Sequence, residues 1–337
     1  MSRKTTRLED LARMAGVSIS TASRALNDNP AVNARTKQKI WKLARDHDYP
    51  FRHYMPAGPI GAEATIALVA PRPQGREGRL SDPFFLELLA GVGEAARERG
   101  CDLIISHVTP ATYEDLLAAM TTSRADGVIF LGQSTLHAAF NRLVETEGRF
   151  VVWGAELPDQ TYCSVGSDNT AGGRRATAHL ARLGRKRIAF LGDLDPPEAM
   201  QRHRGYLEAV ESAGLGVDPE LIVSAHFEVE SAEASVDSMI RRGLQFDGVV
   251  CASDQIALGA MRALQHAGRS VPGDVSVIGF DNVPFSRYSR PALSTMAQDT
   301  MKAGRLMVSK LLDHAGDVVG RSERLPTDLI VRESCGG

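Results

Sequence analysis

Apolar residues recur with helical spacing near the start of the chain. Between residues 8 and 15 they fall at i, i+3, i+4 and i+7, which predicts one buried helical face. These residues are Leu8, Leu11, Ala12 and Ala15. Gly16 then permits a tight turn, and a second short helix follows, with Val17, Ala22, Ala25 and Leu26 on its inner face. Two short amphipathic helices around a glycine turn are typical of a helix-turn-helix, whose second helix enters the major groove of DNA. The side chains that we expect on or near the DNA side are Ser18, Ile19, Ser20, Thr21, Ser23 and Arg24.

A third helix is predicted at about residues 34–47, where Ile40, Leu43, Ala44 and His47 share one face. It would complete a three-helix DNA-binding domain over residues 1–50. The stretch 49–64 then contains three prolines and two glycines, which disfavour a long helix. We therefore predict a hinge or linker over 51–63.

From residue 65 the pattern changes to apolar runs that alternate with amphipathic helices. Expected strands lie at 65–70, 102–107, 127–131, 150–153, 187–191, 221–224, 248–251 and 275–280. Repeated β-α units predict an α/β core (64–337) of parallel sheets with helices on both faces. We expect two sheets, with the change near 163–167 and a final stretch that returns to both. The first lobe is placed at about 64–165 and 292–317, and the second at about 166–291 and 318–334.

Charge distinguishes the first segment from the rest of the chain. Residues 1–54 contain 11 Lys and Arg against 5 Asp and Glu, whereas the remainder contains 28 against 36. A basic segment on an acidic body suits a DNA-binding head on a ligand-binding body, because DNA phosphates attract the former. Chance clustering would give the same count, so charge alone does not decide the question.

Composition and motifs argue against several other classes. The chain has no run of 18 apolar residues and no apolar leader behind its charged start, so we expect neither a membrane span nor secretion. Its four cysteines are widely spaced, which predicts buried thiols in a cytoplasmic, nucleoid-associated protein and no metal site. We find no motif of a hydrolase, a nucleotide-binding loop or a zinc protease, and we predict no enzyme and no cofactor. Asp193 and Asp195, followed by two prolines, are interpreted as a loop before a helix.

A series of motifs resembles the LacI/GalR family of bacterial transcription regulators over essentially the whole chain. The strongest is L-A-R-M-A-G-V-S-I-S-T-A-S-R-A-L-N at 11–27, followed by V-N-A-R-T at 32–36. Others are D-P-F-F-L-E-L-L-A-G-V at 82–92, A-D-G-V-I at 125–129, S-D-N at 167–169, H-L-A-R-L-G-R-K-R-I-A at 179–189, R-H-R-G-Y at 202–206, S-D-Q-I-A-L-G-A at 253–260 and I-G-F-D-N at 278–282. The resemblance implies a helix-turn-helix head, a hinge and a two-lobed, Rossmann-like core of the type I periplasmic-binding-protein kind.

For the head, the resemblance places Ile19 and Ser20 at base-contacting positions and Arg24 at another DNA-contacting position. It places Ser18, Thr21, Ser23 and Asn27 where the family contacts or braces the phosphate backbone. Ser18 could also cap the second helix, and the two roles can coexist. Family hinges usually contain A-R-x-L, whose Leu enters the minor groove. This chain has Met55, Pro56, Ala57 and Gly58 there, so we expect a divergent hinge in which Tyr54 or Met55 substitutes.

For the core, sugar-type ligands need charged and amide groups for hydroxyls and an aromatic face for the ring. Asp281 follows the strand V-S-V-I-G-F and Arg202 precedes G-Y; the resemblance makes both ligand contacts. Other candidates, each with a plausible role as a cap or core residue, are Phe84, Phe85, Trp153, Asp168, Phe227 and Ser253. Asp254 is expected to cap the following helix. Gly154 stands where many family members have Asp, so Trp153 could stack there instead.

Members of the family that this chain resembles are generally homodimers on palindromic operators. With that resemblance, the sequence predicts a homodimeric repressor that binds operator DNA under the control of a small sugar or glycoside. Ligand binding would favour one lobe arrangement and so alter the spacing of the two heads. A nucleobase acting as co-repressor is the alternative effector, and a cytoplasmic sugar-binding protein without a regulatory role is a further alternative.

Overall fold

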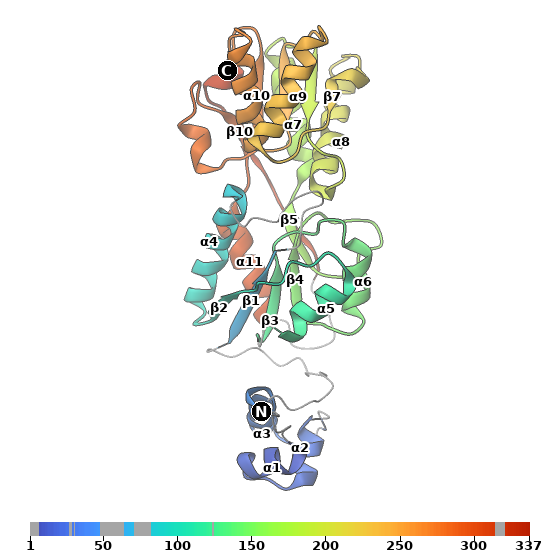
Figure 1. The fold of residues 1–337 in the computed structure, drawn as a ribbon, viewed down its shortest axis with the longest axis vertical. Helices are drawn as coiled ribbons and strands as arrows, with labels where there is room; N and C mark the ends of the chain where they lie inside the picture. Colours follow the sequence, from blue (N-terminus) through green and yellow to red (C-terminus); the bar gives the residue numbers. More distant parts are fainter. Residues whose placement is uncertain are drawn as a thin grey trace, which may run out of the picture. The chain divides into compact units, whose positions relative to one another are not determined.

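A computed structural model describes residues 7–26, 29, 31–47, 64–70, 82–122, 125–313 and 321–337. These residues belong to two compact units, a helical head and a larger α/β core (Figure 1). The expected linker 51–63, with Tyr54, Met55 and Pro56, lies outside the described residues, as does the DNA-contact candidate Asn27.

Three helices form the head: α1 (Leu8–Ala15), α2 (Ile19–Leu26) and α3 (Ala34–Asp46). α1 ends at Gly16, whose φ of +71° is a left-handed conformation that glycine adopts at low cost. The apolar faces of the helices meet in one small core of Leu11, Ala12, Ala15, Ala22, Ala25, Leu26, Val32, Ile40, Trp41 and Ala44. The predicted three-helix head with its helix-turn-helix is confirmed.

The first lobe of the core is a parallel six-stranded sheet in the order β11-β5-β4-β3-β1-β2. Its strands are β1 (Thr65–Val69), β2 (Asp102–Ile105), β3 (Gly127–Phe130), β4 (Phe150–Trp153), β5 (Ser164–Ser167) and β11 (Glu323–Leu325). On one face pack α4 (Pro83–Glu98) and α11 (Thr300–Asp313), and on the other pack α5 (Tyr113–Thr122) and α6 (His137–Val144). Ile66 and Leu68 of β1 face the first pair of helices, whereas the alternate residues Ala67 and Val69 face the second.

The second lobe is a six-stranded sheet in the order β12-β10-β9-β8-β6-β7, in which β12 alone is antiparallel to its neighbour. Its strands are β6 (Ile188–Leu191), β7 (Ile222–Val223), β8 (Gly248–Cys251), β9 (Ser276–Asp281), β10 (Ser294–Ala297) and β12 (Asp328–Ile330). Its helices are α7 (Asn169–Arg182), α8 (Pro197–Ser212), α9 (Val229–Arg241) and α10 (Asp254–His266), with 3₁₀ turns η1 (Pro219–Leu221), η2 (Pro284–Arg287) and η3 (Glu333–Cys335). The predicted α/β core with two sheets is confirmed.

Two expectations near the lobe boundaries need correction. Residues 164–167, expected to be the point where the chain changes sheet, form β5 of the first sheet. This strand has only one large apolar residue, Val165, so its hydrophobicity is low although all four residues are buried. The limits expected at 292 and 318 are also displaced, because β10 belongs to the second sheet and β11 to the first. The last two short strands are therefore divided between the lobes, β11 in the first sheet and β12 in the second.

The carboxyl edges of the two sheets face each other. The chain crosses between lobes at the carboxyl ends of three strands: β5, which leads into α7, β10, which leads into α11, and β11, which leads into β12 (Figure 1). In the first sheet β4 runs parallel to β5, and in the second sheet β8 and β9 run parallel to β10. The carboxyl ends of these strands therefore lie at the same two edges. Side chains at the carboxyl ends are therefore the candidates for contact with a ligand between the lobes.

Candidate DNA interface and candidate effector site

The second helix of the head begins at a serine cap. Ser18 Oγ accepts the backbone N–H of Thr21 at 3.1 Å and lies 2.8 Å from the Thr21 hydroxyl. A second hydroxyl, Ser20 Oγ, lies 3.0 Å from Ser18 Oγ. The capping role considered for Ser18 is therefore present, and it leaves the start of α2 with a group of exposed hydroxyls.

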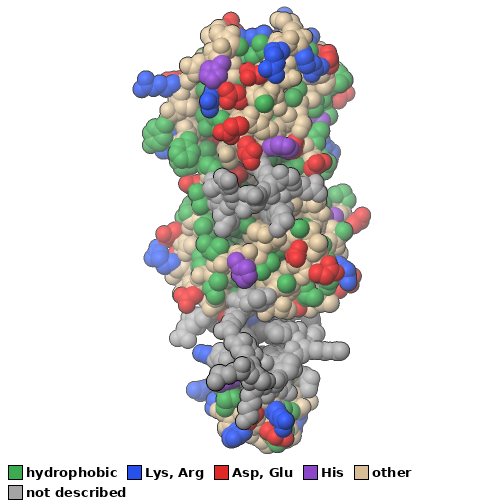
Figure 2. Space-filling model, in the orientation of Figure 1, with side chains coloured by type: hydrophobic (Ala, Val, Ile, Leu, Met, Phe, Trp, Pro, Cys, Tyr) green, Lys and Arg blue, Asp and Glu red, His purple; other side chains and the backbone are tan. Residues whose placement is uncertain are grey.

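The outer face of α2 is polar except for one residue. Ser18, Ser20 and Arg24 are exposed, whereas Thr21 and Ser23 are half-buried. Ile19 is 49% exposed, so its apolar side chain is free to contact the edge of a base. Arg24 Nε donates to the Ser20 carbonyl at 3.2 Å. Lys and Arg side chains are also exposed on the visible face of the head (Figure 2).

In the core, Arg202 of α8 is buried at a close crossing of two helices. α7 approaches α8 so tightly that a Cβ on Gly173 would lie 2.0 Å from the Arg202 carbonyl oxygen. The guanidinium donates through Nε to Asn169 Oδ1 at 2.8 Å and through a second nitrogen to the Ala252 carbonyl. Its Cζ atom lies 3.7 Å from the centroid of the Phe280 ring, a cation–π contact. These partners hold Arg202 in one orientation.

Asp281, at the end of β9, is the counterion of Arg202. One nitrogen of the guanidinium lies 3.8 Å from Asp281 Oδ1, and both side chains are less than a tenth exposed. Gln298 Nε2 donates to the same oxygen at 2.7 Å. Burial raises the pKa of Asp281 well above its ordinary value, and the charge of Arg202 offsets this shift in part. The φ of +115° at Asp281 is a strained conformation for a residue other than glycine, a feature often found at functional sites.

Asp254 is a second buried carboxyl group in this region. It accepts the backbone N–H of Val283 at 2.8 Å and the Thr295 hydroxyl at 2.5 Å. Burial raises the pKa of Asp254 to about 7, and the charge of Asp254 adds to the raised pKa of Asp281. The expectation that Asp254 caps α10 was wrong. Ser253 is the cap, since its Oγ accepts the backbone N–H of Ile256 at 3.2 Å.

The other polar candidate, Asp168, caps α7 by accepting the backbone N–H of Ala171 at 3.0 Å. The aromatic candidates fall into two places. Phe84 lies between Phe85 and Trp153, with ring centroids 5.8 and 5.7 Å apart, in the first lobe. Trp153 is only 4% exposed, whereas Phe84 and Phe85 are half-buried. Phe227 is half-buried against the core of the second lobe.

Gln133, which sequence reasoning did not identify, explains the glycine at 154. Its fully buried amide donates to the Ala155 carbonyl at 2.7 Å and to the Tyr162 hydroxyl at 2.6 Å. A Cβ on Gly154 would lie 2.5 Å from the Gln133 amide carbon, so the amide occupies the space of a side chain at 154. Asn169 and Gln298 were also missed. A lone amide after a strand gives no periodic signal.

The start of α8 contacts the first lobe beside this amide. Gln201 Nε2 donates to the Glu156 carbonyl at 3.0 Å, and the Glu198 carboxylate accepts the backbone N–H of Ala155. Burial raises the pKa of Glu198. Hydrogen bonds from the backbone amides of Glu198 and Ala155 and the charge of Arg202 oppose this shift. Across the lobes, Asp82 at the start of α4 interacts electrostatically with both Arg202 and Asp281. Residues of both lobes therefore surround the Arg202–Asp281 pair.

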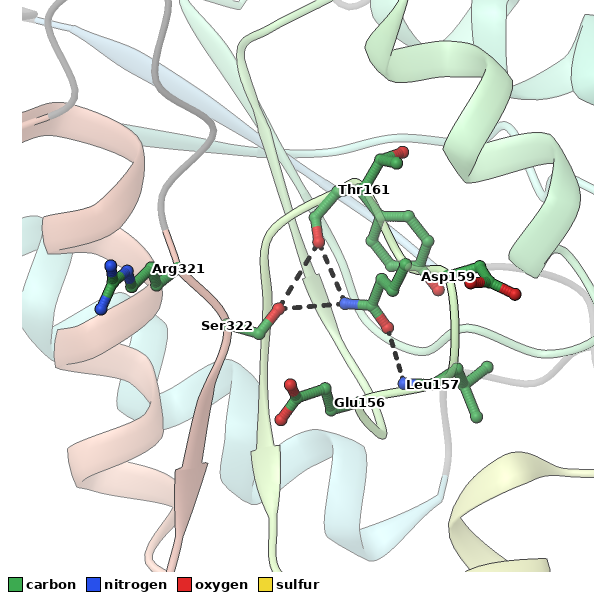
Figure 3. A pocket seen from close by; sticks show the side chains of 8 residues that line it. Glu156, Leu157, Asp159, Thr161, Arg321 and Ser322 are labelled. Atoms are coloured by element: carbon green, nitrogen blue, oxygen red, sulfur yellow. Dashed lines mark hydrogen bonds between the residues drawn. The ribbon is translucent and has the colours of Figure 1, made fainter.

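A separate polar pocket of about 510 Å³ lies in the first lobe. Its lining is Glu156, Leu157, Asp159, Gln160, Thr161, Tyr162, Arg321 and Ser322 (Figure 3). Gln160 crosses it, donating to the Tyr162 carbonyl and to Ser322 Oγ at 3.0 Å each and accepting the backbone N–H of Leu157. None of the expected effector contacts lines this pocket.

Within the described part of the chain, no group of three His, Cys, Asp or Glu side chains could hold a metal ion. No helix in that part is long and apolar enough to cross a membrane. All four cysteines are buried and free, as expected.

Comparisons with known proteins agree with this arrangement. Residues 7–50 match the model described as bacterial regulatory proteins, lacI family, and residues 177–335 match the periplasmic binding protein-like domain. The HTH-type transcriptional regulator CelR of Thermobifida fusca is 30% identical over 98% of this chain and 99% of its own length. The regulator RegA of Clostridium saccharobutylicum is 31% identical over 98% of this chain and 99% of its own. A solved CelR–cellobiose complex superimposes with a TM-score of 0.70 at 29% identity, covering 98% of this chain and 99% of that one. The chain belongs to the LacI family of bacterial DNA-binding transcriptional regulators.

Proposed function

We propose that the protein is a cytoplasmic repressor whose affinity for operator DNA is set by a sugar or glycoside bound between the two lobes. The observation that supports this most is the buried Arg202–Asp281 pair at the carboxyl edge that faces the first lobe. A buried ion pair with a strained aspartate is costly, and a hydroxyl-rich ligand would use both partners.

The chemistry of this site suits a sugar. Gln298 bonds one oxygen of Asp281, which leaves the other oxygen to accept a ligand hydroxyl. Arg202 supplies N–H donors beside it. Asp82, which interacts electrostatically with both groups, is the cap of α4, and Phe84 and Phe85 lie in the first turn of the same helix. Polar partners on one lobe and aromatic rings on the other match the two faces of a pyranose. The relative CelR has been solved with cellobiose.

Exposed apolar residues support the homodimer part of the proposal. Ile104 and Ile105 are 41% and 53% exposed on β2, the edge strand of the first sheet. Phe285 and Tyr288 are 61% and 75% exposed at η2 of the second lobe. Such side chains on an edge strand and a surface turn favour burial against a second copy. A dimer presents two heads, as a palindromic operator requires.

Calorimetry with the full chain tests the effector class. We expect a neutral sugar or glycoside to bind and to change operator affinity in a mobility-shift assay. A panel of mono- and disaccharides is compared with adenine, guanine and hypoxanthine. Binding of a purine that tightens the operator complex, with no response to any sugar, would replace this proposal with a nucleobase co-repressor.

A further inference from the structure

A second group of polar side chains lies at the carboxyl ends of β6 and β7. It consists of Asp193, Ser224 and His226. The amide of Gly192 donates to the Val223 carbonyl at 3.1 Å, and that of Asp193 to the Ala225 carbonyl at 3.0 Å. These bonds continue the parallel β6–β7 ladder beyond the strands. The three side chains are therefore attached to a fixed backbone, although the sequence around Asp193 indicates only a loop.

The side chains of this group bond to one another. The Asp193 carboxylate accepts the Ser224 hydroxyl through one oxygen and pairs with His226 Nδ1 through the other. Helix α9 supports the arrangement, because Ser231 Oγ accepts the His226 amide at 3.0 Å and the Ser235 hydroxyl donates to the Ser224 carbonyl at 2.8 Å. The Asp193 side chain is 20% exposed and that of His226 57% exposed. The imidazole is thus oriented on one side and open to solvent on the other.

This orientation gives the imidazole a defined chemistry. A neutral imidazole that donates Nδ1–H to a carboxylate has its lone pair on Nε2. His226 then presents a fixed acceptor, which suits a hydroxyl group. Phe227, which follows directly and is half-buried, adds an apolar surface next to it.

The position of the group relative to Asp281 indicates the size of the ligand. The strand order β9-β8-β6-β7 puts three strand spacings between the end of β9 and the end of β7. At about 4.8 Å for each spacing, the two polar groups are roughly 14 Å apart along one edge. A single pyranose ring is shorter than this distance. Two linked rings can reach from Asp281 and Arg202 to His226.

We infer that Asp193, Ser224 and His226 form a subsite for a second sugar ring, so that the effector is a glycoside of at least two rings. This inference rests on the proposed function, since it assumes that the first ring binds at Arg202 and Asp281. His226 Nε2 accepts a hydroxyl of the second ring, and Asp193 is a positioning residue that orients the imidazole.

Calorimetry on the full chain compares each monosaccharide with its disaccharides: glucose with cellobiose and maltose, galactose with lactose and melibiose, and xylose with xylobiose. We expect one disaccharide to bind at least about tenfold more tightly than its monosaccharide. His226→Ala should remove most of this advantage while leaving the monosaccharide affinity unchanged. Asp193→Asn, which keeps the size of the side chain, should remove part of it.

A matched control is available at the other end of the same lobe. His266, the last residue of α10, is 59% exposed and pairs with Glu233 at 3.1 Å, so it has the same residue type, exposure and kind of partner. His266→Ala should leave both affinities unchanged. Equal binding of monosaccharide and disaccharide, or equal losses for both in His226→Ala, would overturn the second subsite while the proposed function stands. Failure of every sugar to bind would instead overturn the proposed function.

Discussion

Replacing Asp281 with asparagine should separate stability from ligand binding. The carboxylate is buried beside a second buried carboxyl group, Asp254, and its pKa is raised well above the ordinary value, chiefly by burial. Asparagine keeps the size of the side chain and can still accept the Gln298 N–H. It removes the charge that the folded protein disfavours, so the variant should be at least as stable as the wild type at pH 8.

The pH dependence gives the sign of this effect. A carboxyl group whose pKa is raised by folding binds more protons in the folded state than in the unfolded state. The free energy of unfolding therefore falls as the pH rises from the ordinary pKa of aspartate through the raised one. The advantage of Asp281→Asn should be absent near pH 4 and should grow as the pH rises toward 8. Thermal unfolding followed by circular dichroism at both pH values measures it.

Ligand affinity should change in the opposite direction. A hydrogen bond from a ligand hydroxyl to a carboxylate contributes about 1.5–3 kcal/mol. Its loss corresponds to roughly 10- to 150-fold weaker binding, measured by calorimetry at pH 8. Operator binding without ligand should be unchanged. Undiminished ligand affinity in Asp281→Asn would refute the effector site, and a loss of stability at pH 8 would refute the account of the buried charge.

The surface residue Asp274 provides a contrast. Hydrogen bonds from Ser270 lower the pKa of Asp274, so its contribution to stability is present above the ordinary pKa and is lost as the pH falls. Asp274→Asn should therefore destabilise the protein slightly at pH 8 and leave ligand affinity unchanged. The same substitution thus has opposite effects at the two sites.

Three further predictions concern the head, the dimer and the first lobe. Arg24→Ala should weaken operator binding by about 1–3 kcal/mol per head in a mobility-shift assay, because Arg24 is proposed to contact the bases, whereas Arg13→Ala on α1 should not; equal effects would contradict the assignment of α2. Ile105→Lys should convert a dimer to monomers in analytical ultracentrifugation, because it puts a charge on the β2 edge; an unchanged dimer would place the interface elsewhere. Gly154→Ala should cost about 1–3 kcal/mol in thermal unfolding, and less in a Gln133→Ala background, because the new Cβ overlaps the Gln133 amide; strictly additive losses would show that the two positions do not interact.

The elements that depend on local pattern were predictable from the sequence. The head is one example, since the spacing of Leu11, Ala12 and Ala15 and the glycine turn are properties of a single short segment. The long helices of the core and the strands with several branched residues followed for the same reason. β5 did not, because its burial comes from neighbouring strands and not from its own hydrophobicity.

Side-chain roles that depend on distant partners were not predictable. Ser253 and Asp254 are adjacent, and both residue types are good helix caps. Serine is the cap here because the Asp254 carboxylate is bonded to Val283 and Thr295, which are far along the chain. Gln133 is a similar case, since its partners lie more than 20 residues away. The hydrogen bonds of Asp254 and Gln133 to these distant residues produce no recognisable pattern in the local sequence.

Helix α8 offers a physical route from ligand to lobe arrangement. Its first residues contact the first lobe through Glu198 and Gln201, and Arg202 follows directly in the proposed effector site. A ligand that moves Arg202 must therefore act on the helix that touches residues 155–156. The energy available is limited to the difference in ligand affinity between the two lobe arrangements. Because Glu198 also interacts with Arg202, replacing Glu198 with glutamine should reduce the change in operator affinity caused by the ligand more than it reduces ligand affinity itself.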